Sequence, residues 1–200
     1  MTLVSTSIED GIDAVRAGAV IGVATDTVYG LATSASLPGA DRLLSEAKGR
    51  SVDVPVQVLV SGLEQASSVG MWSRSARRVA EILWPGPVTL VVPRRSDVRL
   101  DLGGTAETIG IRWPATSLAA ELCARFGPLA ATSANRHGEP PLCSAKEVAT
   151  IFSSSIRLVL DGGILSGVAS TVVDLTGDEP SVLREGALSI AEVKVALLSR

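Results

Sequence analysis

The sequence predicts one α/β domain built on a mixed β-sheet, and three observations support this fold class. Short apolar runs bounded by turn residues alternate with longer segments of helical periodicity. The chain has 200 residues, a length that suits one domain with a single core. No internal repeat, low-complexity tract or interdomain linker interrupts it. We therefore expect residues 1–200 to form one domain.

The first predicted elements are a helix, a strand and a polar turn. Ser7 is suited to cap a helix whose apolar residues between Ile8 and Val15 share one face, and Gly18 is placed to end it. The apolar run 19–23 then predicts a strand that leads into Thr25-Asp26-Thr27. Open α/β sheets bind ligands at strand ends, so this turn is the first candidate site.

A second helix and strand follow. An extended run through Thr33 precedes a helix with apolar residues in 43–47, which ends at Lys48-Gly49-Arg50. The β-branched run 56–60 predicts a strand, and Ser73 begins the next helix.

Two prolines and a glycine mark the middle of the chain. Trp84-Pro85-Gly86-Pro87 predicts a rigid, packed turn that leads into a strand over 88–92. Residues 94–104 form the longest irregular segment. A strand over 108–112 then ends in a charge, and a helical face is predicted over 118–123.

Alternation of strands and helices continues in the next segment. A short strand over 129–132 ends in Ser133-Ala134-Asn135, so polarity again appears at a strand end. Ser144 and Glu147 fit a capping box for a helix to about Phe152, and 158–160 predicts a further strand.

The C-terminal segment predicts a hairpin and a helix. Residues 171–175 and 182–184 flank a turn and are expected to pair antiparallel. Ser189 and Glu192 form a second capping box, which opens an amphipathic helix through Leu198.

Composition excludes several classes of protein. No apolar run approaches the roughly 20 residues that span a bilayer, and the N-terminus lacks the pattern of a signal peptide, so we expect a cytoplasmic protein. Cys123 and Cys143 form no metal-binding motif, and His137 is the single histidine, so no metal ligands from side chains are expected. A net charge of −3 argues against a dedicated nucleic-acid binder.

Hydroxyl groups and cations dominate the polar residues at the predicted strand ends. No paired carboxylates, nucleophile elbow or Walker motif appears. Such a set suits an anionic substrate with several oxygens, such as a nucleoside triphosphate beside a carboxylate. Taken singly, each residue also has a structural interpretation, as a helix-end cation or a turn hydroxyl. The set comprises Thr25, Asp26, Thr27, Lys48, Arg50, Thr108, Arg112, Ser133, Asn135, Ser170 and Arg184.

Seven motifs in order resemble those of the YrdC/Sua5 family, the L-threonylcarbamoyladenylate synthases, over about residues 8–190. Any one of them is weak, whereas seven in order are specific. They are Thr25-Asp26-Thr27-Val28-Tyr29-Gly30-Leu31, Lys48-Gly49-Arg50, Trp84-Pro85-Gly86-Pro87-Val88-Thr89-Leu90, Thr108-Ile109-Gly110-Ile111-Arg112, Thr132-Ser133-Ala134-Asn135, Ser170-Thr171-Val172-Val173-Asp174 and Leu183-Arg184-Glu185-Gly186.

The resemblance implies a twisted sheet with a basic concave cavity, the YrdC/DHBP synthase-like fold, without the C-terminal domain of longer members. The resemblance also implies that ATP, bicarbonate and L-threonine react to give threonylcarbamoyl-AMP and pyrophosphate, and that Mg²⁺ enters with ATP. The product would pass to a tRNA threonylcarbamoyl transferase complex. The threonine-binding residues would be Thr27, Arg112, Ala131 and Ser170; the ATP-binding residues would be Lys48, Arg50, Thr108, Ser133, Asn135 and Arg184, with Lys48 and Arg50 stabilising the departing pyrophosphate.

The chain departs from the family pattern at a few positions. Ala24 stands where proline is frequent, Val54 where a polar residue is frequent, and Leu59 at a site that is often polar. Two alternatives to the synthase stay open: a non-catalytic module with weak RNA binding, and a paralogue that adenylates another carboxylate. No association with membranes is expected.

Overall fold

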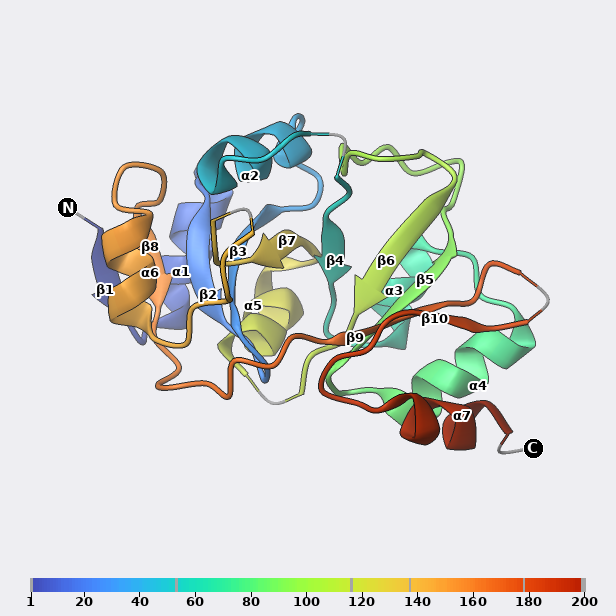
Figure 1. Ribbon diagram of the computed structural model, residues 1–200. Coiled ribbons are helices and arrows are strands. Elements are labelled where there is room, and N and C mark those ends of the chain that lie inside the picture. The colour runs from blue at the N-terminus through green and yellow to red at the C-terminus, as the bar shows by residue number, and fades with distance from the viewer. Residues whose placement is uncertain (1, 53, 116, 137, 178, 199–200) are drawn as a thin grey trace.

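The computed structural model describes residues 2–52, 54–115, 117–136, 138–177 and 179–198, and His137 lies outside them. Within these ranges, ten strands form one mixed sheet and seven helices pack against it (Figure 1). None of these helices is long and apolar enough to cross a membrane. The predicted mixed-sheet α/β fold is therefore confirmed.

The strands follow one another in the sheet in the order β1-β8-β2-β3-β7-β4-β6-β5-β9-β10. Figure 1 shows β4 at the centre, with the strands up to β7 on one side of it and those from β6 on the other. The bounds are β1 Leu3–Ser5, β2 Ile21–Ala24, β3 Tyr29–Ser34, β4 Gln57–Leu59, β5 Val88–Pro93, β6 Thr108–Arg112, β7 Leu129–Ser133, β8 Leu158–Leu160, β9 Thr171–Asp174 and β10 Ser181–Arg184.

The helices begin where the capping residues predict them. Ser7 and Ser73 accept hydrogen bonds at the starts of α1 and α4, and Ser144 with Glu147 forms the capping box of α6. The bounds are α1 Ile8–Arg16, α2 Ala40–Lys48, α3 Leu63–Val69, α4 Arg74–Leu83, α5 Leu118–Phe126, α6 Ala145–Ile151 and α7 Ile190–Leu198.

Two hydrophobic clusters hold the helices to the sheet. The smaller one packs α1 and α5 against strands around β2, with Leu129 and Leu160 fully buried in it. The larger one packs the remaining helices against the sheet and includes Val58 of β4, Leu90 of β5 and Ile111 of β6, all with no exposed surface. Side chains alternate across a strand, so the other face of β4, β5 and β6 stays free to line a cavity.

Three features differ from the sequence-based expectations. The short strand β1 pairs with β8 and the short helix α3 follows β4, although neither element is predicted. Both have few residues, so their apolar patterns are too short to identify. The final helix is not amphipathic, because Val193 is buried whereas Val195 and Leu198 are exposed on the same helix.

Candidate active site

A cavity of about 630 Å³ opens on the free face of the central strands. Its lining comes from the seven neighbouring strands β3, β7, β4, β6, β5, β9 and β10 of the sheet. The end of α2 and the loop at residues 102–105 also contribute. The lining includes most of the predicted site residues, namely Lys48, Arg50, Thr108, Arg112, Ala131, Ser133, Ser170 and Arg184. Thr27 and Asn135 do not line the cavity, and each contacts a residue that does.

Strand register arranges the lining in three rows across the sheet. Leu59 pairs with Arg112, and two residues along β4, Gln57 pairs with Ala131. Two residues further along β7 lies Ser133, which pairs with Gly30. Successive rows are therefore about 7 Å apart, since a strand rises about 3.3 Å per residue. The Arg112 row and the Ser133 row form opposite ends of the cavity.

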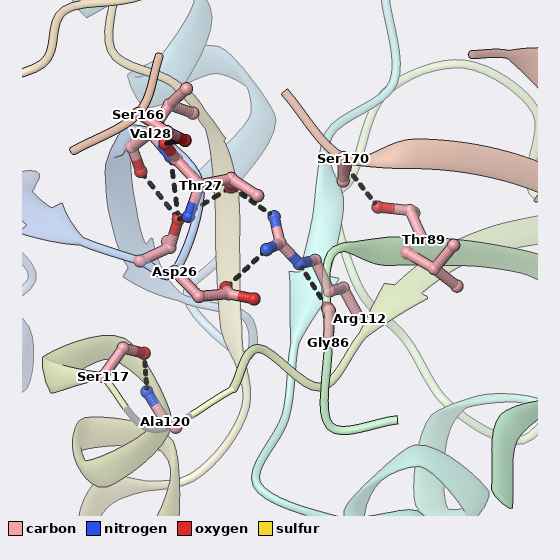
Figure 2. A network of polar contacts seen from close by, with 12 residues as sticks. Asp26, Thr27, Val28, Gly86, Thr89, Arg112, Ser117, Ala120, Ser166 and Ser170 are labelled. Atoms are coloured by element: carbon pink, nitrogen blue, oxygen red, sulfur yellow. Dashed lines mark hydrogen bonds and ion pairs between the residues drawn. The ribbon is translucent and has the colours of Figure 1, made fainter. Parts of the chain in front are cut away.

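Arg112 is held in one conformation at its end of the cavity, although its side chain is only 2% exposed. Nη2 donates to Asp26 at 2.5 Å, Nη1 to the Thr27 hydroxyl at 2.9 Å and Nε to the Gly86 carbonyl at 3.1 Å (Figure 2). Burial lowers the pKa of Arg112, and the Asp26 carboxylate opposes that shift. The guanidinium thus stays charged and fixed in place.

The Thr25-Asp26-Thr27 turn is organised by the Thr25 hydroxyl. It accepts from the backbone N–H of Thr27 and of Val28, and it donates to the Val28 carbonyl at 2.7 Å. The Thr27 hydroxyl lies 3.0 Å from that of Thr25 and is left to donate to it, since the Thr25 proton is already used. Thr27 is therefore a support of Arg112, and the sequence prediction misses the equal role of Asp26.

Lys48 connects the end of α2 to β7 at the opposite end of the cavity. Nζ donates to the carbonyl and hydroxyl of Ser133 at 2.7 and 2.9 Å, and to Asn135 Oδ1 at 2.8 Å. Its pKa is lowered to about 8, chiefly by burial and further by the cations Arg50 and Arg184. Asn135 is thereby placed behind Lys48 rather than in the cavity.

Arg50 differs from the other cations of the cavity in having buried donor atoms without a hydrogen-bond partner among the described residues. These atoms are Nε and Nη2, and burial lowers the pKa of Arg50. A buried guanidinium without acceptors costs free energy unless an anion binds. Arg50 therefore indicates a binding site for an oxyanion.

A third group of polar residues connects β4, β5 and the start of β9. Arg184 donates to the Ser170 carbonyl at 2.8 Å, and the Ser170 hydroxyl lies 3.0 Å from that of Thr89. The Thr89 hydroxyl in turn donates to Gln57 Oε1 at 2.8 Å. Sequence reasoning missed Gln57 and Thr89. One signal was present, because Gln57 is the polar residue in an otherwise apolar strand.

Of the three departures from the family pattern, Val54 and Leu59 line the cavity and Ala24 does not. Val54 is 41% exposed at its edge, and Leu59 is buried in its floor. Among the described residues, no cluster of three or more histidine, cysteine or acidic side chains is placed to hold a metal ion.

The lining is electropositive. It contains Lys48, Arg50, Arg112 and Arg184, and no aspartate or glutamate among the described lining residues. Buried cations with hydroxyl groups beside them bind and orient anions strongly, because few water molecules screen the charges. Such a cavity suits two anionic groups bound at opposite ends.

The chain is similar to known proteins over most of its length. The chain is 38% identical over 194 residues to a putative threonylcarbamoyl-AMP synthase of Mycobacterium tuberculosis H37Rv, covering 94% of this chain and 89% of that protein. It is 38% identical over 183 residues to the threonylcarbamoyl-AMP synthase of Pyrococcus abyssi, covering 90% of this chain and 54% of that protein.

Solved structures agree in fold. The crystal structure of P. abyssi Sua5 complexed with L-threonine superposes with a TM-score of 0.89 at 34% identity, covering 98% of this chain and 60% of that one. The profile of the Sua5/YciO/YrdC family, which carries the description "Telomere recombination", matches residues 13–186. The chain therefore belongs to the Sua5/YciO/YrdC family.

Proposed function

We propose that the protein is an L-threonylcarbamoyladenylate synthase, which converts ATP, bicarbonate and L-threonine into threonylcarbamoyl-AMP and pyrophosphate. One observation carries the proposal: the cavity holds the fixed Arg112 at one end and the Lys48–Arg50 pair at the other. Two anionic substrates that must react with each other need such an arrangement. The relatives that bear the synthase name support the assignment.

The threonine end is assigned to Arg112 and Ser170. A guanidinium has five N–H donors, and three of those of Arg112 are used by Asp26, Thr27 and Gly86. One hydrogen on each Nη is left, which is the pair that a carboxylate accepts bidentately. Thr27 acts through Arg112, and Ala131 lines the cavity floor beside Gln57, one row from Arg112.

The ATP end is assigned to Lys48, Arg50, Thr108, Ser133 and Arg184, with Asn135 acting through Lys48. The cavity residues fit Mg²⁺ only as an ion already bound to ATP, because no described carboxylate lines the cavity. Mg²⁺ would be held by the phosphate oxygens and would neutralise part of their charge. Lys48 and Arg50 are the side chains placed to stabilise the charge of the departing pyrophosphate.

Two steps account for the product. The threonine amine forms a bond to the bicarbonate carbon, and water leaves, which gives a carbamate with one negative charge. A carbamate oxygen then attacks the α-phosphorus, and the bond from that phosphorus to the bridging oxygen breaks as pyrophosphate leaves. The protein supplies position and charge for both steps.

A direct assay tests the proposal. Incubating the protein with ATP, Mg²⁺, bicarbonate and labelled threonine is expected to yield threonylcarbamoyl-AMP and one pyrophosphate per product. Folded protein that forms no such product would contradict it. Adenylation of another amino acid would favour the paralogue. Salt-sensitive RNA binding without turnover would favour the RNA-binding module.

The fate of the product is part of the same proposal. A carbamoyl adenylate is a reactive mixed anhydride, so we propose that a tRNA threonylcarbamoyl transferase complex consumes it in the cytoplasm.

ATP binding is expected to be accompanied by proton uptake above pH 8. Lys48 has a pKa of about 8 in the free protein, so it is largely neutral at pH 8.5 to 9. The triphosphate favours the charged ammonium and raises that pKa, so the complex holds more protons than the free protein. Calorimetry in buffers of different ionisation enthalpy measures the uptake. Lys48→Met should remove it, whereas Lys194→Met on the exposed face of α7 should not.

A further inference from the structure

Gln57 is the polar side chain on β4 that faces the cavity, and the proposed roles above leave it without a function. It stands in the run Val56–Val60, whose other residues are apolar. The side chain is half-buried, so its amide lies partly within the protein and partly against the cavity.

The neighbours of Gln57 across the sheet are small. It pairs with Ala131 of β7, and it lies beside Gly110 of β6 because Val58 pairs with Ile111. A Cβ atom placed on Gly110 would lie 3.9 Å from the Cβ of Gln57 and 3.4 Å from Cγ2 of Thr89. The glycine therefore leaves the floor open next to the amide.

A chain of hydrogen bonds fixes which way the amide faces. Gln57 Oε1 can only accept, so the Thr89 hydroxyl donates its one proton to Oε1 at 2.8 Å. The Ser170 hydroxyl, 3.0 Å from that of Thr89, is then the donor in that contact. With Oε1 bound to Thr89, the Nε2 group with its two N–H donors is turned away from Thr89, and no described residue accepts from it.

The backbone of Gln57 lies in the middle row between the two ends of the cavity, and its amide reaches Thr89, which stands opposite Arg112 on β5. Arg112 pairs with Leu59, two residues along β4 from Gln57, and Ser133 lies two residues along β7 from Ala131. Each end is thus about 7 Å away along the strands. The carbamate carbon must lie between the threonine nitrogen and the α-phosphorus, which is this middle row.

We propose that the Gln57 Nε2 group binds the carbamate oxygens and so holds the carboxylated amine in line with the α-phosphorus. This inference rests on the proposed function and adds a residue to it. A neutral donor suits the position, because it holds the anionic carbamate in place without neutralising the attacking oxygen as a cation would. Gln57 only donates hydrogen bonds, and no bond to it forms or breaks.

Two substitutions separate this role from simple packing. Gln57→Leu removes the donors and keeps the volume. Gln57→Glu keeps the shape and the acceptor for Thr89, and it replaces the two N–H donors by a negative oxygen. We expect kcat/KM for bicarbonate to fall about tenfold in the leucine variant and about 100-fold in the glutamate variant, because a carboxylate repels the carbamate. Dissociation constants for ATP and threonine, measured separately, should change less than about twofold, and the melting temperature should be retained.

Each other outcome counts against the inference. A leucine variant with unchanged bicarbonate dependence would show that Gln57 only fills space. Equal losses in ATP and threonine binding would show that it maintains the shape of the cavity. A wild-type protein that forms no product would overturn the proposed function itself. An active wild-type protein whose Gln57 variants have unchanged kinetics would overturn only the role of Gln57.

Discussion

Lys48→Met is expected to lower kcat for threonylcarbamoyl-AMP formation at least about 100-fold, which corresponds to about 2.7 kcal/mol of transition-state stabilisation. Lys48 is 5% exposed and lies among Arg50, Ser133 and Asn135 at the proposed phosphate end. A buried ammonium acts on a leaving group more strongly than an exposed one, because little water screens its charge. Methionine fills nearly the same space and carries no charge.

The substitution is expected to leave the fold intact. Removing the ammonium takes one hydrogen bond each from the Ser133 carbonyl and Asn135 Oδ1. The carbonyl still accepts from the Asn135 N–H at 3.1 Å and Oδ1 from the Ser133 hydroxyl at 2.6 Å, so the cost lies at the lower end of about 1–3 kcal/mol. The substitution also removes the cost of burying a charge, which offsets part of that loss. Threonine affinity and the melting temperature check the fold, and Lys194→Met provides an exposed lysine as the matched control.

One outcome would assign Lys48 a purely structural role. If the methionine variant turned over at the wild-type rate, Lys48 would serve only to fasten α2 to β7 and complement the dipole at the helix end. If the variant lost threonine binding as well, the damage would be general rather than confined to the phosphate end.

Most of the fold was predictable because local signals agreed with each other. Ser7, Ser73 and Ser144 each begin a helix, and the turn at Trp84-Pro85-Gly86-Pro87 leads into β5. These signals act within a few residues, which is the range that sequence patterns describe well. β1 and α3 were missed because tertiary packing, rather than a long periodic pattern, stabilises them.

Most of the predicted site residues line the cavity, but the sequence did not show which of them contact one another. The resemblance placed Thr27 and Asn135 at the substrates, whereas the structure places them behind Arg112 and Lys48. Such contacts join residues about 85 positions apart, as in Arg112 with Thr27. No spacing rule reports a contact of that kind, because it depends on strand order in the sheet.

Gln57 illustrates the same limit within one strand. The sequence drew attention to Leu59, which lies on the same face of β4 two residues away. The Nε2 donors of Gln57 are left free because Thr89 of β5 binds Oε1, and the sequence does not show that contact between strands.

Replacing Arg112 by methionine is expected to weaken threonine binding at least about 100-fold and to destabilise the protein at the same time. The loss of binding follows from removing a buried, hydrogen-bonded charge, an effect of about 2–5 kcal/mol. The loss of stability has a separate cause, because Asp26 is 14% exposed and would lose its cation. Breaking such a pair by removing one partner costs about 3–5 kcal/mol.

The double variant Asp26→Asn/Arg112→Met separates the two effects. Neutralising Asp26 removes the unpaired charge, so much of the lost stability should return, as measured by denaturant unfolding. Threonine binding should not return, because the proposed partner of its carboxylate is still absent. ATP binding, which belongs to the other end of the cavity, should stay within about twofold in both variants.

Asp26→Asn alone completes the cycle and tests whether Asp26 positions Arg112. Asparagine can still accept the Nη2 hydrogen bond but does not attract the guanidinium as a charge, so the KM for threonine should rise by about tenfold or less while kcat changes little. If the double variant had the same affinity for threonine as the Asp26→Asn variant, Arg112 would not be the carboxylate-binding group. The pair Asp26–Arg112 would then hold the turn of residues 25–27 against Gly86, and the threonine carboxylate would have to be assigned to another cation of the cavity.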